Sequence, residues 1–425
     1  MIPKIASSGA ALGAFAVLAF ACAPAGAWGA KKQESSAQQA PQPGLSPKVG
    51  TALRAAQELA QKQDWNGAFA KVQEAQGVAD KKPYDDFQIA EMLGYIELKR
   101  QNYAQASAAF EQSVASVFAP PEMRTERLKL IAQIAKELKD YPKAIQFAGK
   151  AIESTQNPDP ELFALLGEAQ YLAEDYKAAA QTMGKAVEVA GKAGKPVKEN
   201  WLQVRLSGYA QAKDVPGVLA SLQELAIAFP KQKYLTDLFG EWKRTENDDR
   251  AALNLYRLML ELGLLKEPED YLKMAQLAVD TGMPGEAVRV LEQGTAGKMF
   301  SDEVDAERAH RQLSAARTLA AVDRKTLEGL QATAERSSED DVQLGLVLVS
   351  FGEYAPGAEA LQRGLAKGGI KRPDQAQILL GQALVKLNRP AEAQAAFTAV
   401  EASSRLKTVA ELWRVYTQQP SPLGH

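Results

Sequence analysis

The sequence predicts an all-α protein built from antiparallel helix pairs that stack edge to edge. Ala, Leu, Glu, Lys and Gln dominate the 425 residues, and all five favour helices. No long stretch alternates apolar and polar residues as a half-buried strand does. A helix-break signal also recurs every 34 to 39 residues from about residue 49 onward. A fixed period of this size is typical of arrays of small repeated units, so we do not expect separate globular domains.

The break signal is an Asp or Asn, usually before an aromatic residue. At a helix start, the side chain of Asp or Asn accepts hydrogen bonds from the unpaired N–H groups of the first turn. A Pro in that turn is tolerated because its nitrogen needs no partner. Each break therefore ends one helix and begins the next. The clearest breaks are Asp64-Trp65, Asn102-Tyr103, Asp140-Tyr141 and Asp175-Tyr176, and weaker copies are Asp214-Val215, Asn247-Asp248, Met283-Pro284, Glu353-Tyr354 and Arg389-Pro390.

Small residues stand at regular distances from these breaks. After a break, a small residue is followed four positions later by a larger apolar one, as in Ala106 and Phe110, which puts both on one helix face. Before a break, an apolar residue precedes a small one, as in Leu93-Gly94. We expect the small residues to let two helices approach and the larger ones to fill the space beside them. Further apolar–small pairs are Ile131-Ala132, Leu166-Gly167, Phe239-Gly240, Met274-Ala275, Leu344-Gly345 and Leu380-Gly381.

This pattern resembles the tetratricopeptide repeat (TPR), which has a leucine–glycine pair in its helix A and an Ala and a Phe in its helix B. The resemblance covers about residues 49–405. It implies a right-handed superhelical solenoid of about nine to ten repeats. The unit at 303–337 fits least well, because His310 occupies its glycine-like slot. One long helix from Asp302 to Ala321 is the alternative there.

The N-terminus carries features of an export signal. Lys4 precedes an apolar run, and Ala25-Gly26-Ala27 fits a cleavage site, so we expect residues 1–27 to be a signal peptide. A membrane anchor is the alternative. A second alternative is a lipoprotein in which the only cysteine, Cys22, is lipidated, although Ala19 stands where a lipobox has Leu. The protein is accordingly expected to be exported and periplasmic, or an outer-membrane lipoprotein if Cys22 is lipidated.

The remaining boundaries follow from composition and periodicity. Residues 28–48 are rich in Gln, Ser, Ala and Pro and are expected to form a disordered linker. Residues 49–402 then form the TPR solenoid and 419–425 a disordered tail. Residues 403–418 carry apolar side chains at helical spacing and are expected to cap the last repeat, because an uncovered terminal repeat would expose its apolar face.

The composition argues against catalysis and against nucleic acid. Two histidines, His310 and His425, are too few for a histidine metal cluster, and no G-x-S-x-G elbow accompanies them. We therefore expect no enzyme activity, no cofactor and no metal. With 50 Lys and Arg against 52 Asp and Glu, the chain lacks the basic footprint of a nucleic-acid binder. A wall-cleaving enzyme on a helical superhelix is a less favoured alternative, because the repeats leave no room for a catalytic domain.

The resemblance also implies where a partner binds. In a TPR superhelix the A helices line the concave surface, and their second, fifth, ninth and twelfth slots share one face. Those slots hold aromatic, amide and charged residues, which suit an extended peptide or a partner helix; the alternative is that they form solvated faces. The predicted partner-binding residues are Glu91, Tyr95, Lys99, Lys129, Gln133, Lys136, Glu168, Tyr171, Gln203, Asp237, Glu241 and Arg244, followed by Gln276 and Gln382 in later repeats.

The second half is similar to exported TPR proteins encoded beside TonB–ExbB–ExbD systems. The similarity runs from Phe229-Pro230 to Ala287 and includes Leu379 to Ala383 and Trp413 to Tyr416. It implies a periplasmic accessory to outer-membrane uptake, with TonB-system or other envelope proteins as partners. A lipid-anchored outer-membrane or cell-wall assembly factor is the alternative, and only lipidation of Cys22 would bring the protein into contact with a membrane.

Overall fold

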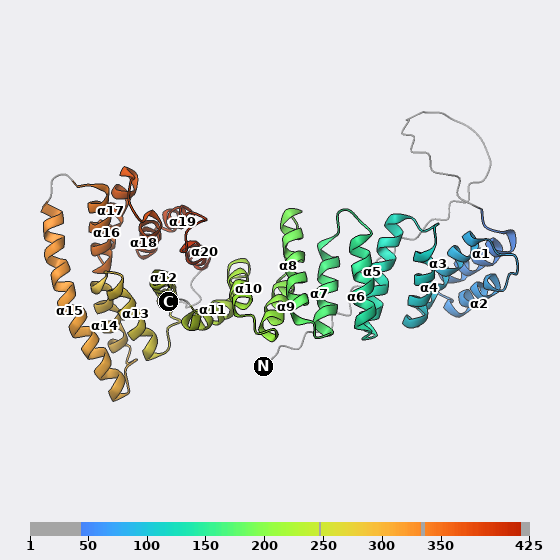
Figure 1. Cartoon of the computed structure of the whole chain (residues 1–425), viewed down its shortest axis with the longest axis horizontal. Coiled ribbons are helices and arrows are strands. Elements are labelled where there is room, and N and C mark those ends of the chain that lie inside the picture. Colours follow the sequence, from blue (N-terminus) through green and yellow to red (C-terminus); the bar gives the residue numbers. More distant parts are fainter. Residues whose placement is uncertain (1–43, 246–247, 333–335, 418–425) are drawn as a thin grey trace, which may run out of the picture. The chain divides into compact units, whose positions relative to one another are not determined.

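The computed structural model describes residues 44–245, 248–332 and 336–417, and every regular element among them is a helix (Figure 1). All the helices belong to the unit that begins at Ser46. The expected signal peptide, all but the last residues of the expected linker 28–48 and the expected tail 419–425 lie outside the described residues. No helix among the residues described has the length and apolar character needed to cross a membrane.

Nine helix pairs and two further helices make up the described residues, which confirms the predicted all-α solenoid of helix pairs. The first five pairs are α1 (Pro47–Gln61) with α2 (Trp65–Gln76), α3 (Pro83–Lys99) with α4 (Tyr103–Ala115), α5 (Pro121–Glu137) with α6 (Tyr141–Glu153), α7 (Pro160–Leu172) with α8 (Tyr176–Lys192), and α9 (Glu199–Gln211) with α10 (Val215–Ala228). The other four are α11 (Gln232–Thr245) with α12 (Asp249–Glu261), α13 (Pro268–Asp280) with α14 (Pro284–Ala296), α16 (Ser338–Ser350) with α17 (Tyr354–Lys367), and α18 (Pro373–Lys386) with α19 (Pro390–Thr398). The two further helices are α15 (Glu303–Ala332) and α20 (Lys407–Tyr416).

The turn from helix A to helix B is the same in most pairs. In the first pair, the N–H of Asp64 donates to the carbonyl of Leu59 over 2.9 Å, and Gln63 takes a left-handed conformation with a φ of 62°. This is a Schellman turn, which satisfies the last carbonyls of helix A. The carboxylate of Asp64 also accepts from the N–H of Gly67 over 2.9 Å. One Asp therefore closes helix A and caps helix B. Asp140, Asp175 and Asp214 cap their B helices in the same way, whereas Asn102 makes no side-chain cap.

The predicted small–large contacts hold the two helices of a pair together. A Cβ placed on Gly94 of α3 would lie 2.5 Å from the ring of Phe110 in α4, and one on Gly381 of α18 would lie 2.4 Å from the ring of Phe397 in α19. Both aromatic rings are almost fully buried. A larger residue at either glycine would overpack the contact, so the spacing in the sequence has a direct steric cause.

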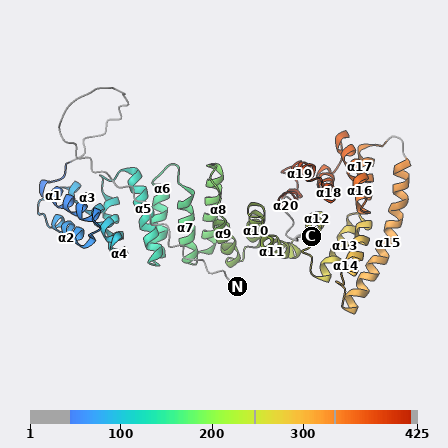
Figure 2. The same ribbon diagram turned by 180° about the vertical axis from the view of Figure 1, so that it is seen from behind.

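The least regular repeat is a single helix. Helix α15 runs without interruption from Glu303 to Ala332, so the alternative of one long helix is confirmed and the helix extends well beyond Ala321. It packs against α13, α14 and α16, as both views of the chain show (Figures 1 and 2). A helix pair at 303–337 is therefore wrong. The sequence lacks the break residue in mid-segment that would have divided this helix.

The C-terminal helix does more than cover the last pair. Helix α20 packs on α19, as a cap does, and it also contacts α10 and α12 (Figure 1). The indole N–H of Trp413 donates to the carbonyl of Asn254 over 2.9 Å, and the hydroxyl of Tyr416 donates to the carbonyl of Lys231 over the same distance. A regular solenoid has contacts only between near neighbours, so helices α10 to α20 form a closed unit.

Candidate functional site

The predicted partner-binding residues of α3, α5 and α7 lie on helices joined by ion pairs. Glu91 of α3 accepts two hydrogen bonds from Arg127 of α5, at 2.9 Å from Nε and 2.7 Å from Nη2. It also accepts from the hydroxyl of Ser113 in α4. Glu91 is buried, so its carboxylate is occupied inside the stack of repeats. The guanidinium of Arg127 lies over the ring of Phe110, 5.0 Å from its centre.

A second ion pair ties the next two A helices together. Lys136 of α5 donates to Glu168 of α7 over 2.6 Å, and both side chains are half-buried. Because each bond joins side chains on successive A helices, the spacing between these helices is fixed by polar contacts as well as by the core. The A-helix face of α3, α5 and α7, which we define by Tyr95, Gln133 and Tyr171, is therefore preorganised.

Aromatic side chains are partly exposed on this A-helix face. Tyr95 of α3 makes an edge-to-face contact with Trp65, with ring centres 6.1 Å apart, and Lys99 lies over its ring at 5.7 Å. Tyr171 of α7 contacts Tyr176 in the same way, at 5.3 Å. Each tyrosine thus keeps one part of its ring against the protein and another part open to solvent, an arrangement that suits binding surfaces.

An amide and a lysine lie between the two tyrosines. Gln133 of α5 is half-buried, and its side chain makes no hydrogen bond within the described residues. Lys129, one turn earlier, is also half-buried. Burial raises the pKa of the nearby Asp159 carboxyl, but hydrogen bonding from Lys195 and, to a smaller extent, the charge of Lys129 outweigh burial and lower that pKa. Gln133 therefore has both amide groups available for the backbone of a bound peptide.

The later predicted residues are engaged locally. Gln203 of α9 donates to the hydroxyl of Tyr234 in α11 over 2.7 Å, and Tyr234 in turn donates to Glu199. Lys231 donates to both oxygens of Glu199, and these bonds, followed by that of Tyr234, lower the pKa of the Glu199 carboxyl.

The three predicted residues of α11 pair within their own helix. Asp237 accepts from Lys233, and Glu241 accepts from Arg244. These pairs do not link α11 to another helix, and Asp237 and Arg244 are exposed. The structure therefore brings together the predicted residues of α3, α5 and α7, whereas those of α11 form separate surface pairs.

Gln382, which was predicted to contact a partner, packs inside the protein. It is buried, and its amide donates to the side-chain oxygen of Asn254 over 2.8 Å. Arg257, one turn along α12, pairs with the buried Glu286 of α14 and also reaches Gln382. Together with Trp413 these residues form a polar node, which we define as Asn254, Arg257, Glu286, Gln382 and Trp413. The node joins α12, α14, α18 and α20.

The sequence analysis missed the polar node, although a signal for it exists. The fifth slot of helix A is Lys129 in α5, but it becomes Leu272 in α13, Val342 in α16 and Ile378 in α18, all of them buried. Apolar residues in a slot expected to face a partner indicate that other parts of the chain cover this face. Gln276 of α13 remains exposed and bonds only Asp280 of its own helix.

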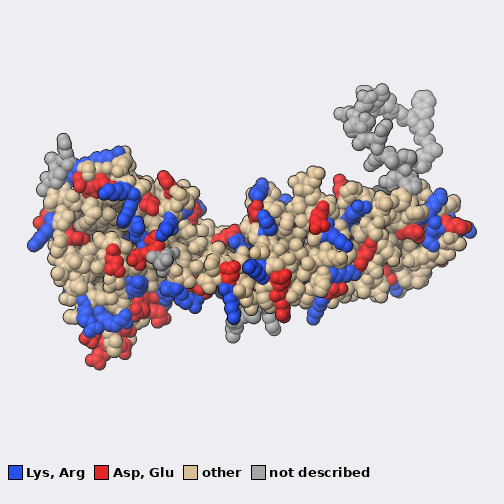
Figure 3. Space-filling view, viewed as in Figure 1, with Lys and Arg blue, Asp and Glu red and all other residues tan. Residues whose placement is uncertain are grey.

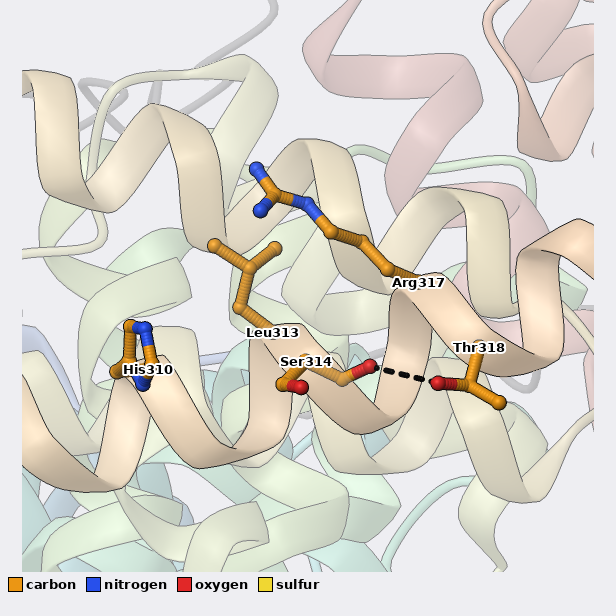
Figure 4. Close-up of a pocket in the computed structure, with 5 residues that line it drawn as sticks. All are labelled: His310, Leu313, Ser314, Arg317 and Thr318. Atoms are coloured by element: carbon orange, nitrogen blue, oxygen red, sulfur yellow. Dashed lines mark hydrogen bonds between the residues drawn. The ribbon is translucent and has the colours of Figure 1, made fainter.

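Potential metal ligands and charged side chains are scattered over the described residues. No group of three or more His, Cys, Asp or Glu side chains in the described part of the chain is placed to hold a metal ion. Basic and acidic side chains are interspersed over the face seen in Figure 3. A shallow hollow of about 360 Å³ lies along α15, lined by His310, Leu313, Ser314, Arg317 and Thr318 (Figure 4).

Known structures similar to this chain share low sequence identity and low TM-scores with it. No protein-family model and no curated protein matches the chain significantly. A tetratricopeptide repeat protein from Parabacteroides merdae ATCC 43184 is 12% identical, with a TM-score of 0.34 over 80% of this chain and 100% of that one. The apo form of RapI is 12% identical, with a TM-score of 0.32 over 75% and 99%. The TPR2AB domain of yeast Sti1, in a complex with pHSP90, is 13% identical, with a TM-score of 0.25 over 69% and 98%. At such TM-scores the likeness adds no argument, and the fold rests on the helix pairs and their contacts.

Proposed function

We propose that this chain is a non-catalytic, periplasmic scaffold of TPR type that holds a protein or peptide on its A-helix face. One observation carries the proposal. Tyr95, Gln133 and Tyr171 stand on successive A helices, they are partly exposed, and ion pairs hold those helices at a fixed spacing. Such a surface loses little conformational entropy when a partner binds.

The chemistry of this surface favours a peptide segment as its ligand. The amide of Gln133 has no hydrogen-bond partner within the described residues and can both donate to and accept from a peptide backbone. The two tyrosines supply apolar area with a polar tip on either side of it. By contrast, the polar node fills the corresponding face of the C-terminal repeats, so we assign partner binding to α3, α5 and α7.

Site-specific photocrosslinking tests this assignment. A photoreactive residue replaces Gln133 in one variant and Gln181, an exposed glutamine on the B helix α8, in the matched control. We expect position 133 to crosslink one defined segment of a partner protein in intact cells and position 181 to crosslink none. Equal yields at both positions, or no adduct at position 133, would refute partner binding on this face.

We further propose that the partner belongs to a TonB-linked outer-membrane uptake system. This part rests on the sequence similarity of residues 229–287, 379–383 and 413–416 to exported TPR proteins of such systems. Mass spectrometry of the adduct formed at position 133 identifies the partner. A TonB, ExbB or ExbD segment, or an outer-membrane receptor, supports the proposal, and a cytoplasmic protein as the only partner overturns the periplasmic assignment.

A lipid-anchored assembly factor is the second candidate, and Cys22 is the observation that favours it. Mass spectrometry of the mature N-terminus distinguishes the two. A chain that begins near Trp28 supports a periplasmic scaffold released after Ala27, and an acylated Cys22 as the first residue supports the anchored form.

A further inference from the structure

The chain that precedes α1 is fixed to helix α3 at one point. Ser46 donates from its N–H and from its hydroxyl to the carboxylate of Asp85, over 2.9 Å and 2.6 Å. Asp85 lies in the first turn of α3 and is fully buried, and it also accepts from the N–H of Lys82 over 2.8 Å. Burial raises the pKa of this carboxyl, but these hydrogen bonds outweigh burial and lower it, so Asp85 is ionised at neutral pH. The residues before Ser46 therefore leave the protein at the N-terminal end of α3.

An open stripe runs along α3 from this point. Tyr84, Gln88, Met92 and Tyr95 follow one another at helical spacing, and each is partly exposed. The stripe begins at the residue next to Asp85 and ends at Tyr95, which belongs to the A-helix face. We call Tyr84, Gln88, Met92 and Tyr95 the α3 stripe.

The α3 stripe combines aromatic rings with an amide and contains no charged side chain. The ring of Tyr84 makes an edge-to-face contact with Phe118, with centres 5.4 Å apart, so part of it is held in place. The amide nitrogen of Gln88 donates to the hydroxyl of Tyr84 over 2.9 Å, and its oxygen accepts no hydrogen bond within the described residues. A peptide on this stripe therefore meets aromatic surface and a free hydrogen-bond acceptor.

This chemistry favours an extended, proline-containing ligand over a helix. A helix bonds its own N–H groups and offers none to the oxygen of Gln88 along most of its length. An extended segment has free N–H groups, and the described residues contain no strand to pair with the rest of them. Proline has no N–H, and proline-containing segments pack on aromatic side chains in the polyproline II conformation without leaving many donors unpaired.

The chain carries such a segment directly before its fixed point. Residues 37–43 read Ala-Gln-Gln-Ala-Pro-Gln-Pro and hold no charge. In polyproline II conformation, the five residues from Ser46 back to Pro41 span about 16 Å. The ten residues from Asp85 to Tyr95 span about 15 Å along α3. Pro41 can therefore reach Tyr95, and the short tether keeps the segment at an effective concentration of about 1 mM.

We propose that residues 37–43 dock on the α3 stripe of their own chain and cover Tyr95 until a partner displaces them. Pro41 packs on the ring of Tyr95, and the N–H of Gln42 donates to the oxygen of Gln88. The segment is then a built-in competitor for one end of the A-helix face. The competition rests on the proposed function, whereas the docking itself does not.

Photocrosslinking within the purified, processed chain tests the docking. A photoreactive residue replaces Gln88 in one variant and Gln105, an exposed glutamine on α4 of the same pair, in the matched control. Trypsin cleaves after Lys32 and Lys48, so mass spectrometry recovers the segment as one peptide, 33–48. We expect position 88 to capture this peptide about fivefold more than position 105, in a product with the mass of one chain.

A proline variant tests the chemistry of the docking. Pro41→Gly with Pro43→Gly removes both rings and loosens the segment, so it should lower capture at position 88 about threefold. Ser35→Gly with Ser36→Gly changes the same segment outside residues 37–43 and is the matched control, which should leave capture unchanged. In cells, the proline variant should raise capture of the partner at position 133 about twofold, because the competitor is weakened.

Four results would overturn the proposal. These are equal capture of peptide 33–48 at positions 88 and 105, a product with the mass of two chains, capture at position 88 that the proline variant does not lower, and partner capture at position 133 that it does not raise. A second copy of the chain would be the occupant in the second case. If position 133 captures no partner in any variant while position 88 still captures peptide 33–48, the docking stands and the proposed function fails.

Discussion

Trp413→Ala should loosen helices that lie far from residue 413 in the sequence. Trp413 is 2% exposed, its ring stacks on Phe397 with centres 5.8 Å apart, and its indole N–H donates to the carbonyl of Asn254 in α12. Replacing a buried Trp by Ala costs about 3–5 kcal/mol through lost packing and the cavity that remains. The lost hydrogen bond adds about 1 kcal/mol because the carbonyl of Asn254 is left without this donor.

Hydrogen exchange measures where this free energy is lost. A loss of about 4 kcal/mol, the lower end of that total, makes local opening on the order of 1,000-fold more frequent, since 1.4 kcal/mol corresponds to a factor of ten. We expect this loss of protection in α19 and α20 and also in α10 and α12, because α20 contacts both of them. Helices α1 to α8 should keep their protection, because in a repeat array each pair is stabilised mainly by its neighbours and these helices do not pack against α20.

Two further variants act as controls. Trp413→Phe separates the packing of the ring from its hydrogen bond, and Trp201→Ala shows the effect of losing a buried Trp outside α10 to α20. Trp413→Phe keeps a ring beside Phe397 and loses the indole N–H, so it should cost only about 1 kcal/mol. Trp201→Ala removes an equally buried Trp from α9, where it packs with Ala164 and Met183 of the preceding pair, and its effect should stay in α7 to α9. If Trp413→Ala lowered protection in α19 and α20 alone, α20 would be a simple cap, and the closed unit of α10 to α20 would be refuted.

Three further predictions test other contacts by chemical denaturation. Gly94→Ala should destabilise the chain by about 1–3 kcal/mol, because its Cβ would lie 2.5 Å from the buried ring of Phe110. Gly149→Ala, whose Cβ would have no atom within 4 Å, should stabilise the helix by about 1 kcal/mol. Increased stability in both variants would contradict a steric role for Gly94. Glu91→Leu alone should cost about 3 kcal/mol by leaving Arg127 without its carboxylate, and adding Arg127→Met should recover most of that loss; no recovery would mean that the two side chains are not coupled. Burial opposes ionisation of Asp341, but hydrogen bonds from neighbouring cations outweigh it and lower the pKa of this carboxyl. The ionised carboxylate therefore stabilises the fold fully above the ordinary Asp pKa of about 4, and this stabilisation is lost as the pH falls through the lower folded-state pKa. Asp341→Asn should make the free energy of unfolding fall less steeply with decreasing pH in this acid range, and an unchanged slope would argue against this role.

The regular part of the fold was predictable because its causes are local. Asp64 ends one helix and caps the next, and both interactions involve residues within five positions of it. The contact of Gly94 with Phe110 crosses only one turn between adjacent helices. A signal of this kind repeats with each unit, so most helix pairs can be counted from the sequence. At 303–337 the sequence left a weak repeat and one long helix as alternatives, and the structure has the long helix.

The candidate site was predictable only as a set of slots. Periodicity places Glu91, Gln133 and Gln382 on comparable faces of their A helices, yet Glu91 is buried by Arg127, Gln133 is partly open and Gln382 is buried against Asn254. The position of a residue within the repeat predicts only the direction in which its side chain leaves the helix. What it then meets depends on neighbours that are one repeat away in the first case and more than a hundred residues away in the last.

The sequence by itself determined the helix pairs, their boundaries and their nearest-neighbour packing, because hydrogen bonding and steric fit act over a few residues and recur in phase. Only the tertiary structure decided that α20 returns to α10 and α12 and that Gln382 is buried against Asn254. Those outcomes depend on contacts between helices far apart in the chain, such as Trp413 with Asn254, which the spacing of the repeats does not specify.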